Sequence, residues 1–221
     1  MSEPVTVPLD GGGSVSALLD APPNPKWTYV LAHGAGAGMR HPFLESMAHA
    51  LAERGIGTMR YQFPYMERKR GRPDPPAVAE ATVRAAVRAA AVALPGLPLV
   101  AGGKSFGGRM TSGAAAREPL PGVKGIAFLG FPLHPPGKPG STRADHLDAV
   151  AVPMLFLQGT NDDFARLDPL EPVVERLGAR ATLHLIEGGD HSFKVPKSVR
   201  RPGPVLEELA DTIAQWTRGL A

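Results

Sequence analysis

Short apolar runs alternate with amphipathic segments along nearly the whole chain, and this alternation limits the possible folds more than any other feature of the sequence. The runs typical of buried strands are residues 27–32, 56–63, 97–101, 125–131, 153–158 and 181–186. The segments with helical spacing of apolar residues are 42–54, 78–94, 106–117, 168–178 and 204–219. Strands that alternate with helices predict an α/β fold, a mostly parallel sheet with helices on both faces. Ligands of such sheets bind at the carboxyl ends of the strands, so we expect function in the loops that follow them.

Glycine and proline mark the turns between these elements. Residues 4–9 and 14–20 flank Gly11–Gly13, a pattern that predicts an N-terminal hairpin. Asp168 directly precedes Pro169 at the start of a helical pattern, which predicts that the Asp168 side chain caps that helix.

Size and composition favour one soluble globular domain that spans residues 1–221. Hydrophobic residues make up 43% of the chain and charged residues 20%, and no apolar run is long enough to cross a bilayer. The N-terminal residues lack the basic patch and apolar stretch of a secretory signal, so we expect a cytoplasmic location. Because the chain has no cysteine, disulfides, thiolate nucleophiles and cysteine-based zinc sites are excluded.

The basic residues predict solvated loops rather than a nucleic-acid interface. The formal net charge is +3, and two basic clusters lie at residues 67–72 and 197–201. Aromatic residues are only 6% of the chain and do not interleave with these clusters, as they do in many nucleic-acid-binding surfaces.

The loop after the apolar run 97–101 contains the strongest chemical signal. Residues 103–107 read Gly-Lys-Ser-Phe-Gly, a G-x-S-x-G pattern with a strand before it and a helix after it. In a nucleophile elbow the serine takes a strained backbone conformation, and the flanking glycines let strand and helix approach closely. We therefore expect Ser105 to be a nucleophile at the start of a helix, where backbone N–H groups point at a developing oxyanion.

A phosphate-binding loop is the competing interpretation of residues 102–105, which read Gly-Gly-Lys-Ser. That motif requires an earlier glycine at a fixed distance from the lysine, and the residue there is Pro98. The spacing therefore disfavours nucleotide binding.

A serine hydroxyl needs a base, and the base needs an acid that orients it. In the nucleophile-elbow fold these partners follow the serine in the order acid, then histidine, each in a loop after a strand. Asp162 stands three residues beyond Gly159, which ends the run 153–158, and His191 follows the last apolar run. We assign Asp162 as the acid and His191 as the base.

Three other aspartates compete for the role of acid, and each has a simpler use. Asp168 is the predicted helix cap, Asp190 is placed to brace the loop of its neighbour His191, and Asp163 is one residue out of register.

The remaining histidines carry less information. We interpret His33 as a hydrogen-bonded anchor of the loop beside the serine. His134 follows the run 125–131, and both a structural role and a substrate contact remain open for it. The other four histidines have no metal-ligand spacing with any carboxylate, so no metal is proposed. They are His41, His49, His146 and His184.

Four segments in matching order resemble the α/β-hydrolase superfamily, closest to small dienelactone-hydrolase-like members without a lid. They are the loop 33–36, the elbow 103–107, the turn 159–162 and the loop 190–194. Within these members the chain is similar to a subgroup with relatives in a testis-expressed protein and a histone acetyltransferase complex. The resemblance implies an oxyanion hole formed by the N–H groups of Ala35 and Phe106, and no cofactor. Dienelactone hydrolases proper use a cysteine nucleophile, so their substrate does not carry over.

Together these features predict a serine hydrolase, of the carboxylesterase type, that cleaves a small ester or other acyl substrate through an acyl-enzyme. About twenty residues separate the runs 125–131 and 153–158, too few for a helical cap, so we expect an open pocket. The alternative is a catalytically weak scaffold of the same fold that binds a partner protein.

Overall fold

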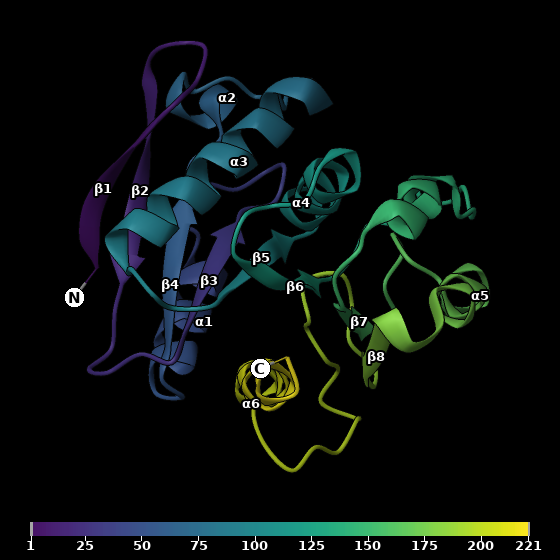
Figure 1. Cartoon of the computed structure of the whole chain (residues 1–221). Helices are drawn as coiled ribbons and strands as arrows, with labels where there is room; N and C mark the ends of the chain where they lie inside the picture. Colours follow the sequence, from purple (N-terminus) through teal and green to yellow (C-terminus); the bar gives the residue numbers. More distant parts are fainter. Residues whose placement is uncertain (1, 221) are drawn as a thin grey trace.

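The computed structural model describes residues 2–220 as one eight-stranded sheet with helices on both of its faces (Figure 1). The strands are β1 (Glu3–Pro8), β2 (Ser14–Asp20), β3 (Trp27–Ala32), β4 (Ile56–Tyr61), β5 (Leu99–Lys104), β6 (Val123–Leu129), β7 (Met154–Gly159) and β8 (Ala181–Ile186). The α-helices are α1 (Pro42–Ala52), α2 (Pro64–Glu67), α3 (Pro76–Ala93), α4 (Phe106–Arg117), α5 (Leu167–Leu177) and α6 (Val205–Arg218). Short 3₁₀ helices are η1 (Thr142–Ala149) and η2 (Gly178–Arg180).

The strand order is β1-β2-β4-β3-β5-β6-β7-β8. The N-terminal hairpin joins the sheet through antiparallel pairs, β1 with β2 and β2 with β4. All pairs from β4 to β8 are parallel, so their carboxyl ends lie at one edge of the sheet. The prediction of a mostly parallel α/β sheet is confirmed.

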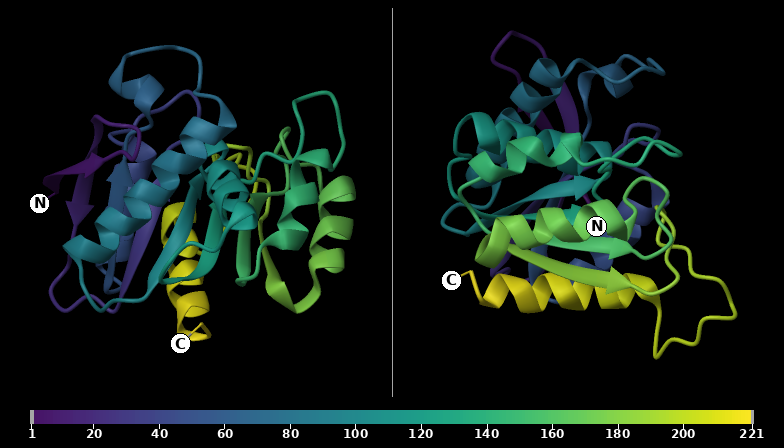
Figure 2. Two further views of the ribbon diagram at one scale, coloured as in Figure 1. Left: turned by 45° about the horizontal axis from the view of Figure 1, so that its top comes forward. Right: turned by 90° about the vertical axis from the view of Figure 1, so that its right-hand side faces the viewer.

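Two hydrophobic layers separate the sheet from its helices. Helices α3, α4 and α5 pack on one face with Val83, Met110 and Leu170 among their buried residues. Helices α1 and α6 pack on the other face through residues such as Met47 and Ile213. Figure 2 shows α6 across the sheet from α3 and α4. Among the described residues, no helix is both long and apolar enough to cross a membrane.

The structure corrects two local predictions. Helix α5 begins at Leu167 with Arg166 as its cap residue, so Asp168 is not the cap. The Asp168 carboxylate instead accepts a hydrogen bond from Arg166 Nε at 3.0 Å from within the first turn, where a negative charge is favourable. Strand β6 ends at Leu129 because Gly130 turns the chain with φ +73°, so Phe131 is buried outside the strand.

The connection between β6 and β7 forms no cap over the site. Within residues 2–220 it contains one regular segment, η1, which packs against α4. The carboxyl ends of the strands therefore stay accessible from solvent on this side.

Candidate active site

Ser105 occupies a sharp turn between β5 and α4. Its backbone lies at φ +50° and ψ −115°, a region that non-glycine residues rarely adopt. A Cβ atom on Gly103 would lie 2.2 Å from the carbonyl oxygen of Ala32, and one on Gly107 would lie 2.6 Å from the carbonyl oxygen of His33. Only glycine fits at both positions, so the two flanking glycines permit the strained serine.

Ser105, His191 and Asp162 form one hydrogen-bonded chain. His191 Nε2 lies 2.8 Å from Ser105 Oγ, and His191 Nδ1 lies 2.7 Å from Asp162 Oδ2. The ionised carboxylate accepts the Nδ1–H, which leaves Nε2 free to accept the serine hydroxyl proton. These residues follow β5, β8 and β7, and the parallel strands bring them to the same edge of the sheet.

The Asp162 carboxylate is fully buried, and both of its oxygens accept hydrogen bonds. Its Oδ1 accepts the Phe164 backbone N–H at 2.8 Å, and its Oδ2 also accepts Gln158 Nε2 at 2.5 Å. The Gln158 Oε1 atom in turn accepts the Phe131 N–H at 2.9 Å. Our sequence analysis missed Gln158, although a lone amide side chain at the end of an apolar strand was the available signal.

The rival aspartates lie elsewhere. Asp190 Oδ1 accepts the backbone N–H groups of Ser192 and Lys194, each at 2.8 Å, and so braces the loop that carries His191. Asp163 is exposed, and Asp168 lies on the exposed face of α5. None of the three contacts the His191 ring through a hydrogen bond.

A pocket of about 620 Å³ opens above Ser105. The loop 34–37, Phe43 and Phe164 line it together with Ser105 and His191. The Phe164 ring packs on the imidazole of His191, with 4.3 Å between ring centroids. Small and aromatic residues form much of the wall, and Lys104, Lys194 and His41 add polar groups to it, which suits a small, partly apolar ligand.

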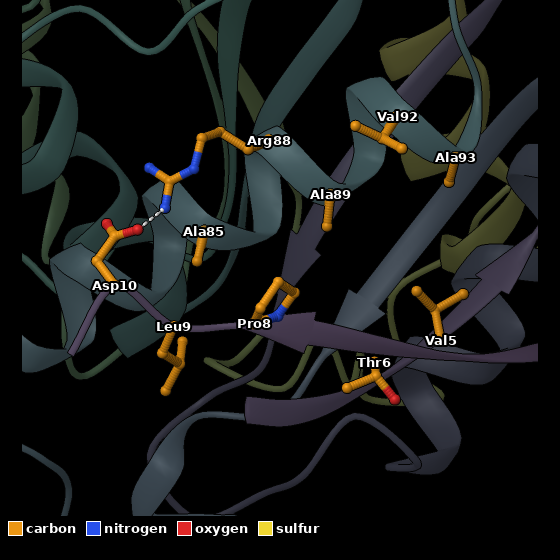
Figure 3. Close-up of a pocket in the computed structure, with 10 residues that line it drawn as sticks. All are labelled: Val5, Thr6, Pro8, Leu9, Asp10, Ala85, Arg88, Ala89, Val92 and Ala93. Carbon is orange, nitrogen blue, oxygen red and sulfur yellow. Dashed lines mark hydrogen bonds and ion pairs between the residues drawn. The ribbon is translucent and has the colours of Figure 1, made fainter. Parts of the chain in front are cut away.

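A second groove, between β1 and α3, has no serine or histidine among its lining residues. It has a volume of about 370 Å³, and an ion pair of 2.6 Å between Arg88 and Asp10 lies at one end of it (Figure 3). The groove lies at the edge of the sheet farthest from β8. The pocket at Ser105 is therefore the candidate active site.

Ala35 and Phe106 lie beside the serine on two different segments. Phe106 is the first residue of α4, where backbone N–H groups have no partner within the helix. Ala35 belongs to the loop after β3 and lines the same pocket as Ser105. Among residues 2–220, neither amide N–H of this pair donates a hydrogen bond to another group.

His33 anchors the loop that carries Ala35. Its ring is fully buried, its Nδ1 bonds the Gly34 carbonyl at 2.8 Å, and its Nε2 accepts the Phe63 N–H at 3.1 Å. The Tyr65 hydroxyl donates to the Ala35 carbonyl at 2.7 Å and holds the same loop. Burial lowers the pKa of His33 to about 4, so the ring is neutral at pH 7.

His134 lies outside the residues that line the pocket. The side chain is buried, with Nδ1 bonded to the Pro135 carbonyl at 2.9 Å. Its Nε2 accepts the Arg166 N–H at 3.1 Å. Because both ring nitrogens bond to the backbone, the geometry favours the structural alternative for His134 over a substrate contact.

Comparisons with known proteins show the family and the fold of the chain. The model of a family described as "Alpha/beta hydrolase domain" matches residues 25–218. A dienelactone hydrolase from Anabaena variabilis superposes with a TM-score of 0.79 at 20% sequence identity, over 99% of this chain and 97% of its own. A serine hydrolase without a lid from Xanthomonas campestris superposes with a TM-score of 0.75 at 22% identity, over 99% of this chain and 94% of its own. The esterase domain of a Rhodothermus marinus protein gives 0.71 at 16% identity over the whole of both chains.

Proposed function

Because the chain belongs to the alpha/beta hydrolase family, we propose that it is a serine hydrolase that cleaves a small ester or a related acyl bond. The observation that carries the proposal is the hydrogen-bonded chain from Ser105 through His191 to the buried Asp162. A scaffold that only binds a partner does not require these three groups in contact.

In the proposed acylation step, Ser105 Oγ attacks the substrate carbonyl while His191 Nε2 takes the hydroxyl proton. The negative charge of Asp162 stabilises the resulting imidazolium. The N–H groups of Ala35 and Phe106 receive the oxyanion of the tetrahedral intermediate. The imidazolium then protonates the leaving group, and the acyl-enzyme forms.

Deacylation repeats these roles with water as the nucleophile. His191 Nε2 takes a proton from the water, whose oxygen attacks the acyl carbonyl. Collapse of the second tetrahedral intermediate returns the proton from His191 to Ser105 and releases the acid.

The pocket supports a small acyl substrate. Its volume of about 620 Å³ and its walls of Phe43 and Phe164 suit a compact acyl group rather than a long chain. A solved neighbour, Est1E from Butyrivibrio proteoclasticus, has ferulic acid bound and superposes with a TM-score of 0.73 at 16% identity. A small acyl ligand of that kind is consistent with the proposed pocket.

Labelling with a fluorophosphonate probe tests the proposal, because such probes phosphonylate serines activated by a neighbouring base. We expect the folded protein to be labelled at Ser105, as located by peptide mapping. The Ser105→Ala variant and heat-denatured protein serve as controls and should not react. A native protein that stays unlabelled would support the scaffold alternative.

A further inference from the structure

Lys104 lies between the elbow glycine Gly103 and the nucleophile Ser105, and the proposed chemistry assigns it no part. Its side chain is partly buried and lines the pocket at Ser105. The ammonium Nζ donates a hydrogen bond to the backbone carbonyl of His191 at 2.5 Å. It also lies 5.4 Å from the centre of the Phe193 ring.

Gly130, which has no side chain, leaves the space in which Lys104 Nζ meets the His191 carbonyl. A Cβ atom at Gly130 would lie 3.0 Å from Lys104 Nζ and 3.5 Å from the His191 ring. The Lys104 ammonium and the His191 imidazole therefore lie beside the same glycine. The ammonium bonds the main-chain carbonyl of His191, and the imidazole bonds Ser105 Oγ.

Other contacts hold the His191 loop on both sides of the histidine, and Asp190 bonds Ser192 and Lys194 within it. The Asn161 N–H donates to the Gly189 carbonyl at 2.9 Å, and the Gly188 N–H donates to Thr160 Oγ1 at 2.8 Å. Among the described residues, Lys104 is the only group that bonds the main chain of His191 itself. This bond directly joins the strand that carries the nucleophile to the residue that carries the base.

We propose that Lys104 is a positioning residue whose ammonium fixes the main chain of His191 and thereby keeps Nε2 on Ser105 Oγ. This inference rests on the proposed function of the same site. Displacement of a catalytic group by about 1 Å is enough to lower a rate by roughly 100-fold, so a bond at this carbonyl affects the chemistry directly.

The charge of Lys104 also makes the contact dependent on pH. Burial lowers the pKa of Lys104 to about 8, and the carboxylates of Asp162 and Asp190, which follow β7 and β8, partly oppose this shift. The Phe193 ring adds no titratable group, and the ring of His191 is already engaged with Ser105 and Asp162. Above about pH 8 the neutral amine forms a weaker bond than the ammonium, because charge-assisted hydrogen bonds are about twice as strong as neutral ones.

The test compares wild type with Lys104→Met, which keeps the length and apolar stem of the side chain and removes its donor. The measurement is kcat and KM on one short activated ester from pH 6 to pH 10. At pH 7 we expect kcat of the variant to be lower by about 10-fold or more, with KM nearly unchanged. The wild-type kcat should fall as pH rises through about 8 and approach that of the variant, which should show no such decline.

Lys197→Met is the matched control, because Lys197 is an exposed lysine on the same connection between β8 and α6. It should retain the wild-type kcat and the wild-type decline above pH 8. The melting temperature at pH 7 separates positioning from a merely structural role. Lys104→Met should melt close to wild type, because the loss of one hydrogen bond is offset by removal of the desolvation penalty of a partly buried charge.

The other possible results contradict either the positioning role of Lys104 or the proposed function. Equal kcat values at pH 7, a variant that keeps the alkaline decline, or a loss of kcat in parallel with melting temperature would overturn the positioning role. A wild type that is labelled by fluorophosphonate yet shows one of these results leaves the proposed function intact. A wild type that is neither labelled nor active overturns the proposed function and this inference with it.

Discussion

Three N–H donors converge on the two oxygens of Asp162, and this determines what a substitution there does. Oδ1 accepts from Phe164, while Oδ2 accepts from both Gln158 and His191. A carboxylate satisfies all three donors, because both of its oxygens are acceptors. An asparagine has only one acceptor oxygen, so its NH₂ group must face one of these donors.

Asp162→Asn should therefore lower kcat by at least about 100-fold on an activated ester, with the protein still folded. The amide cannot stabilise the imidazolium and favours the wrong tautomer of His191, a defect of about 10⁴-fold in a well-studied triad. The same assay on Asp163→Asn and Asp190→Asn gives the comparison, with folding followed by circular dichroism. If either of these variants loses most of its kcat while Asp162→Asn keeps a kcat near that of wild type, our assignment of the acid is wrong.

His33 should make stability depend on pH through its buried, neutral ring. Its pKa is about 4 in the folded protein and near 6.5 in an unfolded chain. Above pH 6.5 both states are neutral and there is no penalty. As pH falls from 6.5 to 4 only the unfolded state takes up the proton, so the free energy of unfolding should fall by roughly 3 kcal/mol.

Urea unfolding at several pH values measures this effect. The His33→Gln variant, which does not titrate, should lose less stability than wild type between pH 6.5 and pH 4. His49→Gln should show the same pH dependence as wild type in this experiment, because His49 is exposed. An equal decline in wild type and His33→Gln would exclude His33 as the cause.

At the scale of secondary-structure elements, the junction of β5 and α4 depends on the close approach of α4 to β3. Gly107, in the first turn of α4, lies directly against the end of β3. A Cβ atom there would meet Ala32 Cβ and the His33 carbonyl oxygen, both at 2.6 Å. Neither neighbour can move far, because Ala32 is paired on both sides within the sheet.

Gly107→Ala should therefore destabilise the protein by about 3 kcal/mol or more, in spite of the higher helix propensity of alanine. The measurement is the free energy of unfolding in urea. The matched control is Gly203→Ala, because a Cβ atom at Gly203 would have no neighbour within 4 Å. Similar unfolding midpoints for the two variants would show that α4 can shift away from β3.

At the scale of the whole molecule, the connection between β6 and β7 leaves the pocket uncovered. In the part of the chain that the structure describes, η1 packs on α4 instead of reaching over Ser105. A long acyl chain therefore finds little apolar surface to replace its contact with water.

Short acyl esters should consequently have higher kcat/KM than long ones, and activity should not rise at a lipid interface. A series of nitrophenyl esters from acetate to palmitate measures this preference, with each rate corrected for spontaneous hydrolysis. A steady rise of kcat/KM towards palmitate would reveal an acyl-binding channel that the open pocket does not account for.

The sequence by itself determined the order of the elements and the family of the fold. The order of the elements follows from local signals, because apolar periodicity and turn residues act over a few neighbouring positions, whereas the family follows from the resemblance of four segments to known hydrolases. The strained turn at Ser105 was also predicted from a local signal, two glycines within one pentapeptide. The order of Ser105, Asp162 and His191 along the chain identified candidates for the site, and their roles stay a proposal that the labelling and kinetic experiments test.

Only the tertiary structure decided which polar groups meet. The Asp168 cap was wrong because the helix begins at Leu167, before the Asp168-Pro169 signature, and Arg166 occupies the cap position without a side-chain capping bond. The bond from Gln158 to Asp162, the burial of His134 and the contact of Lys104 with the His191 carbonyl had no local signature strong enough to predict them. Lys104 and His191 are 87 residues apart in sequence, so only the packing of parallel strands at a common edge brings them together.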